Sequence, residues 1–276
     1  MSQATESASQ AATPTYTLHE GRSPLVVSVP HAGTGVPDEI AARFTVAARE
    51  LPDTDWHVHR LYAFAEALDA TLIVARYSRY VIDLNRPPDD TELYPGSAQT
   101  GLCPLVTFDG TPIYARDEDR PDADEVDARR RRYWAPYHAC LEAQLARVAG
   151  LHGQALLWDA HSIRSVVPRL FDGELPVLNL GTHNGASCAA PIADRVWDAA
   201  RARGYPCVRD GRFRGGYITR HYGRPAHGVH AIQLELAQRA YMHEAPPFQI
   251  NPDRMQALQV ALRQMLEAFI EAAAKA

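Results

Sequence analysis

Short, continuous runs of apolar residues recur along the chain and predict the strands of a sheet. The runs are rich in Val, Ile and Leu, which is typical of strands covered on both faces. The predicted strands are 24–30, 71–77, 155–160, 176–181 and 229–236. The first run ends in VVSVP and is followed directly by a histidine in a glycine-containing turn, HAGTG. A histidine in such a setting suits a metal ligand or a catalytic base better than a core position.

Segments with helical periodicity separate the predicted strands. Residues 56–70 carry an apolar stripe, and residues 188–204 end on a glycine, a common helix stop. Residues 125–149 also have helical character but contain Pro136, which we expect to end or kink the helix. The last helix begins after Asn251, a capping residue followed by proline. Strands that alternate with helices predict a three-layer α/β fold, with a mixed, mostly parallel central sheet flanked by helices.

Two stretches depart from this alternation. Residues 1–15 are rich in Ser, Ala, Gln and Thr, and we expect them to form a disordered tail before a single domain at 16–276. Residues 87–124 are rich in Pro, Asp, Gly and Thr and are long for a loop in a compact domain. Because such loops often cover binding sites, we expect this excursion to pass over the active site; partial disorder is the alternative.

Composition and charge restrict the function classes. The chain has 276 residues, 46% of them hydrophobic, and a net charge of −5, so a sizeable core is expected and a nucleic-acid partner is not. The basic run at 129–132 lies among acidic residues and is expected to be a solvated helix face. The chain has no apolar run of roughly 18 residues and no secretory signal, which favours a cytoplasmic protein, monomeric or a small homo-oligomer, without a membrane partner. The four cysteines are widely spaced and are expected to be free thiols.

Polar side chains stand where the predicted strands end, which is where ligands bind in open α/β sheets. The positions are His31, Arg79, Asn85, Arg86, Asp159, His161 and Glu235, with Asp53 and Asp55 before the first helix. Two histidines and a carboxylate from separate elements are the minimum ligand set of a catalytic zinc site. A chain with 12 histidines offers many such triples. A structural role for both histidines therefore stays open, in which His31 caps a turn and His161 hydrogen-bonds a buried backbone group. Asp159 either orients an imidazole or caps a loop.

Glu235 and the pair Asn85–Arg86 carry the remaining candidate chemistry. Glu235 lies between two leucines in an apolar strand, where a charge needs either an arginine partner or a function. Beside a metal it would act as general base and then as proton donor. An arginine next to an amide suits a substrate carboxylate, although an ion pair with an aspartate of the adjoining IDLNRPPDD would explain Arg86 equally well.

Eight segments of the chain resemble the N-formylglutamate amidohydrolases, also called N-formylglutamate deformylases. The segments are SVPHAG, DTDWHV, LYAFAEAL, RYSRYVIDLNRPPDD, WDAHSIRS, NLGTHNGASC, GGYITRHYG and HAIQLELAQRAYM. They are long and specific, and the resemblance runs from about Pro24 to Tyr241. It implies a zinc-carboxypeptidase-like fold and hydrolysis of N-formyl-L-glutamate to formate and L-glutamate, the last step of a histidine degradation route.

The resemblance also implies a metal site. In the related zinc carboxypeptidases and aspartoacylases, two histidines and a carboxylate hold zinc, and here the histidines match His31 and His161. The HxxE that the wider group usually has is absent, because a threonine stands three residues after the first histidine. We therefore expect the third ligand to be Asp55 in DTDW, with Asp53 as the alternative and Glu39 as a remote third. Zn²⁺ is the implied cofactor, and another divalent metal is the alternative.

The implied mechanism uses the remaining candidates. Glu235 takes a proton from the attacking water and returns it to the leaving amine, while Arg79 stabilises the oxyanion. The implied substrate is a small molecule with two carboxylates. The resemblance implies that Asn85, Arg86 and Arg220 bind these carboxylates.

Three other functions are compatible with these residues. Another zinc amide hydrolase on the same scaffold, such as an N-acyl amino acid deacylase or a carboxypeptidase, would differ in its acyl pocket. A non-catalytic binding protein would hold no zinc. A cysteine hydrolase could use Cys188, which lies near His183, and would stay active with chelators but not after thiol alkylation.

Overall fold

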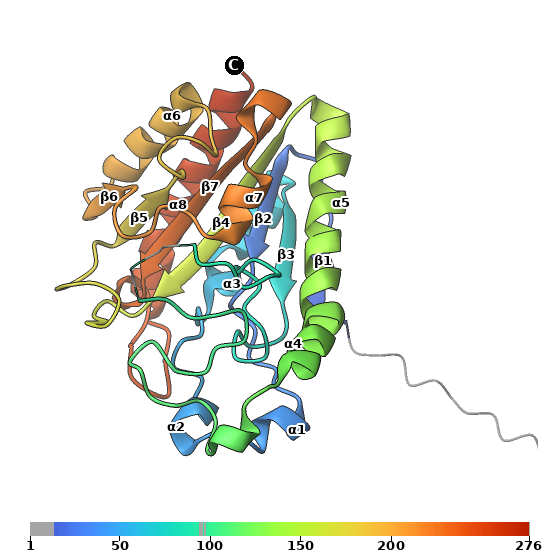
Figure 1. Cartoon of the computed structure of the whole chain (residues 1–276). Helices are drawn as coiled ribbons and strands as arrows, with labels where there is room; N and C mark the ends of the chain where they lie inside the picture. Colours follow the sequence, from blue (N-terminus) through green and yellow to red (C-terminus); the bar gives the residue numbers. More distant parts are fainter. Residues whose placement is uncertain (1–13, 94–95, 97, 276) are drawn as a thin grey trace, which may run out of the picture.

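The computed structural model describes residues 14–93, 96 and 98–275, and a seven-stranded sheet runs through it (Figure 1). The strands are β1 Tyr16–His19, β2 Leu25–Val29, β3 Thr71–Ala75, β4 Ala155–Ile163, β5 Leu178–Gly181, β6 Cys207–Arg209 and β7 Val229–Ala237. All five strands predicted from the apolar runs are present. β1 and β6 escape prediction because these edge strands of four and three residues contain no buried apolar run.

The strand order β1-β3-β2-β4-β7-β5-β6 places four parallel strands in the middle of the sheet. β1 runs antiparallel to β3, and β5 runs antiparallel to β7. The prediction of a mixed, mostly parallel sheet is therefore confirmed. The carboxyl ends of β3, β2, β4 and β7 lie at one edge of the sheet, which brings together the residues at these ends.

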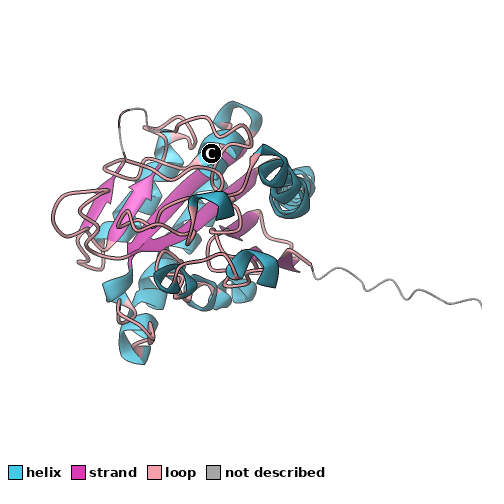
Figure 2. Cartoon of the chain, turned by 60° about the horizontal axis from the view of Figure 1, so that its bottom comes forward, coloured by secondary structure: helices cyan, strands magenta, loops and turns pink. Residues whose placement is uncertain are grey.

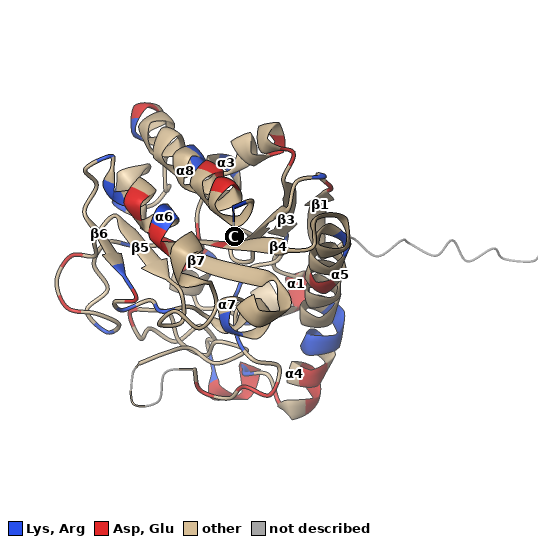
Figure 3. Ribbon diagram, turned by 90° about the horizontal axis from the view of Figure 1, so that it is seen from above, with Lys and Arg blue, Asp and Glu red and all other residues tan. Residues whose placement is uncertain are grey.

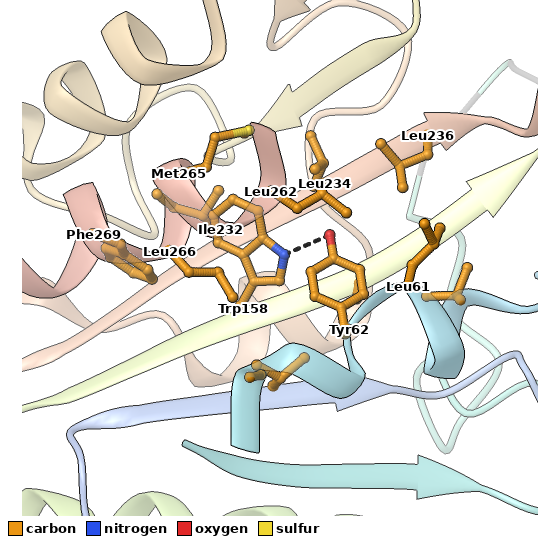
Figure 4. Packing of buried hydrophobic residues seen from close by; sticks show 14 of the residues in the cluster. Leu61, Tyr62, Trp158, Ile232, Leu234, Leu236, Leu262, Met265, Leu266 and Phe269 are labelled. Atoms are coloured by element: carbon orange, nitrogen blue, oxygen red, sulfur yellow. Dashed lines mark hydrogen bonds between the residues drawn. The ribbon is translucent and has the colours of Figure 1, made fainter. Parts of the chain in front are cut away.

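Helices cover both faces of the sheet (Figure 1), as predicted. α5 (Ala135–His152) packs on one face. α6 (Ala190–Arg201) and α8 (Pro252–Ala273) pack on the other. On the face covered by α6 and α8, Trp158 of β4 donates its indole N–H to the hydroxyl of Tyr62 at 2.9 Å. Both residues belong to the apolar cluster between these helices and the sheet (Figure 4). The sheet thus lies between two apolar layers.

The helix predicted at 56–70 has a different inner geometry. It consists of α3 (Val58–Leu61) followed by a 3₁₀ helix (Ala63–Leu68). Both helix types bring residues three apart close to one another, so the apolar stripe is buried although the backbone tightens after α3.

Pro136 lies in a helical segment that changes type. α4 (Ala123–Arg129) is followed by a π-helical segment (Arg130–Trp134) and then by α5, which has Pro136 in its first turn. A proline lacks the N–H that would bond the preceding turn, and a first turn is the position where that loss costs least. The helical segment therefore continues without a break through Pro136, and it changes from π to α type just before the proline, so the helix does not end there.

The excursion at 87–124 runs beside the carboxyl ends of the strands, an end of the molecule covered by loops and short helices (Figure 2). The short helices at this end are α1 Asp38–Ala41 and α2 Val46–Arg49, with 3₁₀ turns at Asp117–Asp119 and Gln238–Ala240. α7 (Tyr217–Tyr222) lies against β4 and β7, and the 3₁₀ turn Pro225–His227 precedes the amino end of β7. In its described part the excursion is anchored by backbone hydrogen bonds, from Thr45 N–H to the carbonyl of Ile113 and from Ala115 N–H to the carbonyl of Arg43, both 2.8 Å.

The basic run at 129–132 is exposed in part, and its first residue, Arg129, is buried. Arg131 and Arg132 are exposed, as expected of a solvated helix face, in the charged segment between α4 and α5 (Figure 3). Arg129 is buried, and its guanidinium donates to the carbonyl of Val81 and the hydroxyl of Tyr114. The expectation of a solvated face is wrong for Arg129, because this side chain ties α4 to the core.

The chain joins the sheet just before β1, where the carbonyl of Thr15 accepts a hydrogen bond from Arg76 N–H at 3.0 Å. The rest of the expected tail, residues 1–13, lies outside the described residues. No helix in the described part of the chain is long and apolar enough to cross a bilayer. The four cysteines are free thiols, as predicted.

His138 of α5 is a buried histidine that is not a candidate site residue. Its Nε2–H donates to the carbonyl of Leu84 at 2.8 Å, and its Nδ1 lies 3.0 Å from the hydroxyl of Tyr222. Burial lowers the pKa of His138 to about 3. Between pH 3 and about 6.5 the unfolded chain binds a proton that the folded protein does not, so stability falls as the pH falls through this range.

We expect His138→Gln to weaken this pH dependence. Between pH 7 and pH 5 the wild-type protein should lose about 2 kcal/mol more of its free energy of unfolding than the variant, because glutamine does not titrate. Urea unfolding of both proteins at the two pH values measures the difference. An equal loss in both proteins would contradict the buried, neutral state of His138.

Candidate active site

The candidate catalytic residues converge at the carboxyl ends of β2, β4 and β7. His31 lies two residues after β2, and His161 lies within β4, opposite Glu235 of β7. Asp55 lies in the loop before α3. These four residues are buried, with exposed fractions between 1% and 7%. The fold thus brings together side chains that lie far apart in the sequence.

Three of these side chains present metal-ligating atoms to one another. Nδ1 of His31 lies 3.2 Å from Nδ1 of His161, and Oδ2 of Asp55 lies 3.0 Å from Nδ1 of His161 and 3.7 Å from Nδ1 of His31. Zinc bonds of about 2.0–2.1 Å in a tetrahedral site would separate neighbouring ligand atoms by about 3.4 Å. The donor types and their spacing therefore fit a divalent cation such as zinc.

Carboxylates approach the outer nitrogens of both rings. Nε2 of His31 lies 2.7 Å from Oδ1 of Asp83, and Nε2 of His161 lies 3.0 Å from Oδ1 of Asp159. At His31 the carboxylate of Asp83 favours the tautomer with its proton on Nε2, which leaves the Nδ1 lone pair for a cation. Asp159 therefore lies beside an imidazole and does not cap a loop.

The two aspartates nearest His31 are held as anions. Burial alone would raise the pKa of Asp55, but hydrogen bonds with His161 and His31 and the charge of Arg79 hold it well below its ordinary value. Burial also opposes ionisation of Asp83, yet the charges of His31 and Arg79 lower its pKa strongly. Buried negative charge of this kind favours a bound cation.

Asp53 bonds to other partners. Its Oδ2 accepts hydrogen bonds from the hydroxyl of Tyr80 and the backbone N–H of Phe108, each at 2.7 Å. It therefore anchors the excursion to the loop that carries Asp55. Glu39 is an exposed residue of α1. Of the three carboxylates considered, Asp55 is the one that lies with the two histidines.

Arg79 lies against this cluster from the segment after β3. Its guanidinium is 3.4 Å from Oδ1 of Asp55, contacts Nδ1 of His31, and lies 4.9 Å from the ring centre of Phe108. Burial opposes its charge, but Asp83 and Asp55 raise its pKa, so Arg79 stays cationic. A fixed positive charge of this kind can stabilise an oxyanion.

Glu235 has a different electrostatic setting. Burial is the main cause that raises its pKa, to about 8. Its Oε2 accepts a hydrogen bond from Nε2 of Gln233 at 3.2 Å, so its side-chain hydrogen-bond partner is an amide and not an arginine. A carboxyl group whose pKa lies near neutrality suits a group that accepts and returns a proton.

A cavity of about 80 Å³ lies at this cluster. The sheet side contributes His31, His161 and Glu235, and the segment after β3 contributes Arg79. The excursion contributes four residues to the wall, namely Ala98, Gln99, Thr100 and Phe108. The prediction that the excursion passes over the site is confirmed for its described part.

Asn85 and Arg86 also line the cavity. Oδ1 of Asn85 accepts a hydrogen bond from Ile218 N–H at 2.8 Å, and its Nδ2 lies 3.1 Å from Nε2 of His161. The Nε of Arg86 donates to the carbonyl of Thr100 at 2.7 Å. The hydrogen bonds of the Arg86 guanidinium go to Thr100 and not to an aspartate of the IDLNRPPDD segment, although the charge of Arg86 helps to lower the pKa of Asp83.

Arg220 is not among the residues that line this cavity. Its guanidinium donates to the carbonyls of Gly215 (2.8 Å) and Leu93 (2.9 Å). Arg212, eight residues earlier, does line the cavity and also packs over the ring of Phe213. The structure therefore brings Arg212, and not Arg220, to the cavity wall.

Several residues at the cavity were not predicted as site residues from the sequence, among them Asp83, Gln233 and Arg212. Gln233 had a usable signal, because side chains two residues apart in a strand share a face and Gln233 lies two before Glu235. Asp83 and Arg212 lie in irregular segments, where no periodicity tells which way a side chain points.

Comparison with known proteins gives the chain its family. The family model of N-formylglutamate amidohydrolase matches residues 23–242. N-formylglutamate deformylases from Pseudomonas putida and Pseudomonas aeruginosa are 50% and 51% identical to the chain, and the alignments cover 92% and 91% of it and 94% of each relative. The crystal structure of N-formylglutamate amidohydrolase from Ralstonia eutropha JMP134 superimposes with a TM-score of 0.79 at 28% identity, over 93% of this chain and 96% of that one. The chain therefore belongs to the N-formylglutamate amidohydrolase family.

Proposed function

We propose that this protein hydrolyses N-formyl-L-glutamate to formate and L-glutamate, using a divalent metal ion, with zinc as the first candidate. The observation that carries the proposal is the buried cluster of His31, Asp55 and His161 beside Glu235, in a cavity with arginines in its wall. The names of the relatives, N-formylglutamate deformylase, support the substrate. The family resemblance supports a role for this reaction as the last step of a histidine degradation route.

His31, Asp55 and His161 would hold the metal. Two imidazole nitrogens and one carboxylate match zinc, and they leave one coordination position open. A divalent cation bound there supplies a Lewis acid and lowers the pKa of a water molecule toward neutrality. Asp83 would keep the ring of His31 oriented for that role, and Asp159 adds negative charge beside the ring of His161.

Glu235 moves the proton. It accepts a proton from the water that attacks the formyl carbon, and it donates this proton to the amide nitrogen as the C–N bond breaks. The pKa of about 8 suits both steps, because a group near neutrality gains and loses a proton at little cost. Arg79 stabilises the negative charge that develops on the formyl oxygen, an effect typically worth about 3 kcal/mol.

Asn85 and two arginines would bind the substrate carboxylates. Asn85 and Arg86 line the cavity, as the sequence resemblance requires. We propose Arg212 for the third position in place of Arg220, because Arg212 lines the cavity and Arg220 does not. A substrate with two negative charges accounts for several arginines in the cavity wall of an acidic protein.

The small cavity predicts selectivity for the formyl group. We expect kcat/KM for N-acetyl-L-glutamate to be about 10- to 200-fold below that for N-formyl-L-glutamate, because one added methyl group in a closed pocket typically costs 1–3 kcal/mol. Assays of formate and acetate release by the purified protein measure this ratio. Equal or faster release of acetate would identify a broader N-acyl amino acid hydrolase, and no release of either acid would favour a binding protein.

A cysteine hydrolase is disfavoured by the setting of Cys188. This thiol is buried, and burial raises its pKa to about 12, so it is not a reactive thiolate at neutral pH. None of the four cysteines is among the residues that line the cavity. We therefore expect hydrolysis to be sensitive to chelators and insensitive to thiol alkylation.

A further inference from the structure

Gln233 of β7 joins Glu235 to the backbone turn before α7. Its side chain is buried (4% exposed) and lines the cavity. Its Nε2 lies 3.2 Å from Oε2 of Glu235, and its Oε1 lies 2.6 Å from the backbone nitrogen of Gly216. Residues 233 and 235 share a face of the strand, so one side chain can reach the other directly.

The contact with Gly216 fixes which end of the Gln233 amide faces Glu235. A backbone N–H can only donate, so the amide oxygen of Gln233 must face Gly216. The NH₂ group of Gln233 must then face Glu235. Gln233 therefore offers Glu235 a donor and not an acceptor, and this hydrogen bond fixes the position of one carboxyl oxygen.

The same turn also holds Asn85. Ile218 N–H donates to Oδ1 of Asn85, which by the same reasoning directs the NH₂ group of Asn85 toward His161. Gly216 permits this packing, because a Cβ there would lie only 2.3 Å from Nδ2 of Asn85. Two buried amides on one turn thus set the positions of a carboxylate-binding residue and of the base.

We propose that Gln233 is a positioning residue for the reaction: it holds one oxygen of Glu235 through its NH₂ group and keeps this carboxylate in the orientation for proton transfer. The inference rests on the proposed role of Glu235 as the base. Gln233 itself does not take up or release a proton, and it acts only through Glu235.

The test is a double-mutant cycle on the hydrolysis of N-formyl-L-glutamate by the metal-loaded protein. Gln233→Met keeps the length of the side chain and removes both the NH₂ donor to Glu235 and the oxygen that accepts from Gly216 N–H. In the wild-type background it should lower kcat about 10- to 100-fold, the range for a lost hydrogen bond to a charged group, and change KM by less than about threefold. In the Glu235→Gln background it should cost less than about twofold more, because the group it orients is already gone.

Two further variants separate a specific effect of Gln233 from a general loss of packing. Gln144→Met removes another buried amide, which does not line the cavity. This amide donates to Glu20 and accepts a hydrogen bond from Arg147. The variant should keep kcat within about twofold of wild type. Gln233→Glu keeps an acceptor for Gly216 N–H and replaces the NH₂ group with a second carboxyl oxygen, which repels the ionised Glu235. It should therefore also lower kcat, even if the methionine variant is unstable. Thermal unfolding of each variant shows whether the fold is intact.

Each failure has a distinct reading. A Gln233→Met loss of the same size with and without the Glu235 carboxylate would overturn the positioning role, since the effect would then be structural. Wild-type kcat in Gln233→Met would overturn it as well. Undiminished turnover in Glu235→Gln would instead refute the proposed role of Glu235, whatever Gln233 does.

Discussion

Replacing Glu235 with glutamine is expected to lower kcat for N-formyl-L-glutamate hydrolysis by about 100-fold or more, the range typical for loss of a general acid–base group. The amide has nearly the same shape, so packing in β7 should be preserved. It cannot accept a proton from water or return one to the amine, and both steps of the proposed mechanism need that proton. KM should change little, because Asn85 and the cavity arginines are untouched.

The measurement needs a control that separates chemistry from metal loss. Metal content per protein should be the same in Glu235→Gln and wild type, because Glu235 is not one of the three grouped ligand residues. Glu125→Gln is a matched change outside the cavity, where Glu125 pairs with Arg43 and Arg129, and it should keep kcat within about twofold. Near-wild-type turnover in Glu235→Gln with full metal content would eliminate Glu235 as the base.

The sheet and the convergence of the site followed from a small number of sequence features. Continuous apolar runs mark strands buried on both faces, and His31 and Glu235 lie near the ends of two such runs. The topology of a parallel sheet then requires these ends to meet, so their proximity could be predicted without knowing any contact. His161 fits the same rule, although β4 runs on to Ile163 and places it inside the strand.

The partners of residues in the loops around the strand ends could not be assigned from the sequence alone. Asp83 looked like a partner for the neighbouring Arg86, but the fold brings it to His31, and that contact spans 52 positions. Arg212 and Arg220 lie in one glycine-rich region, and the path of the backbone decides which of them reaches the cavity. Such choices depend on how a loop folds over the sheet, and neither periodicity nor charge encodes that path locally.

The second ligand carboxylate shows the same limit, since Asp53 and Asp55 stand two residues apart in a loop. The structure separates them by their partners: Asp55 lies with the two histidines, while Asp53 accepts hydrogen bonds from Tyr80 and Phe108. Asp55→Asn should therefore lose its metal on dialysis and lower kcat by more than about 100-fold, because a ligand should matter more than the outer partners, which typically cost 10- to 100-fold.

Asp53→Asn is the matched control for that change. Its amide oxygen can still accept from Tyr80 or Phe108, so we expect retained metal and a loss of about 1–2 kcal/mol in the free energy of unfolding from weakened hydrogen bonds. Metal analysis of both dialysed variants, with unfolding curves of their metal-free forms, gives readouts that do not depend on turnover. If Asp53→Asn lost its metal while Asp55→Asn retained it, the carboxylate ligand would be Asp53, and the fit of Asp55 to the two imidazoles would have no bearing on metal binding.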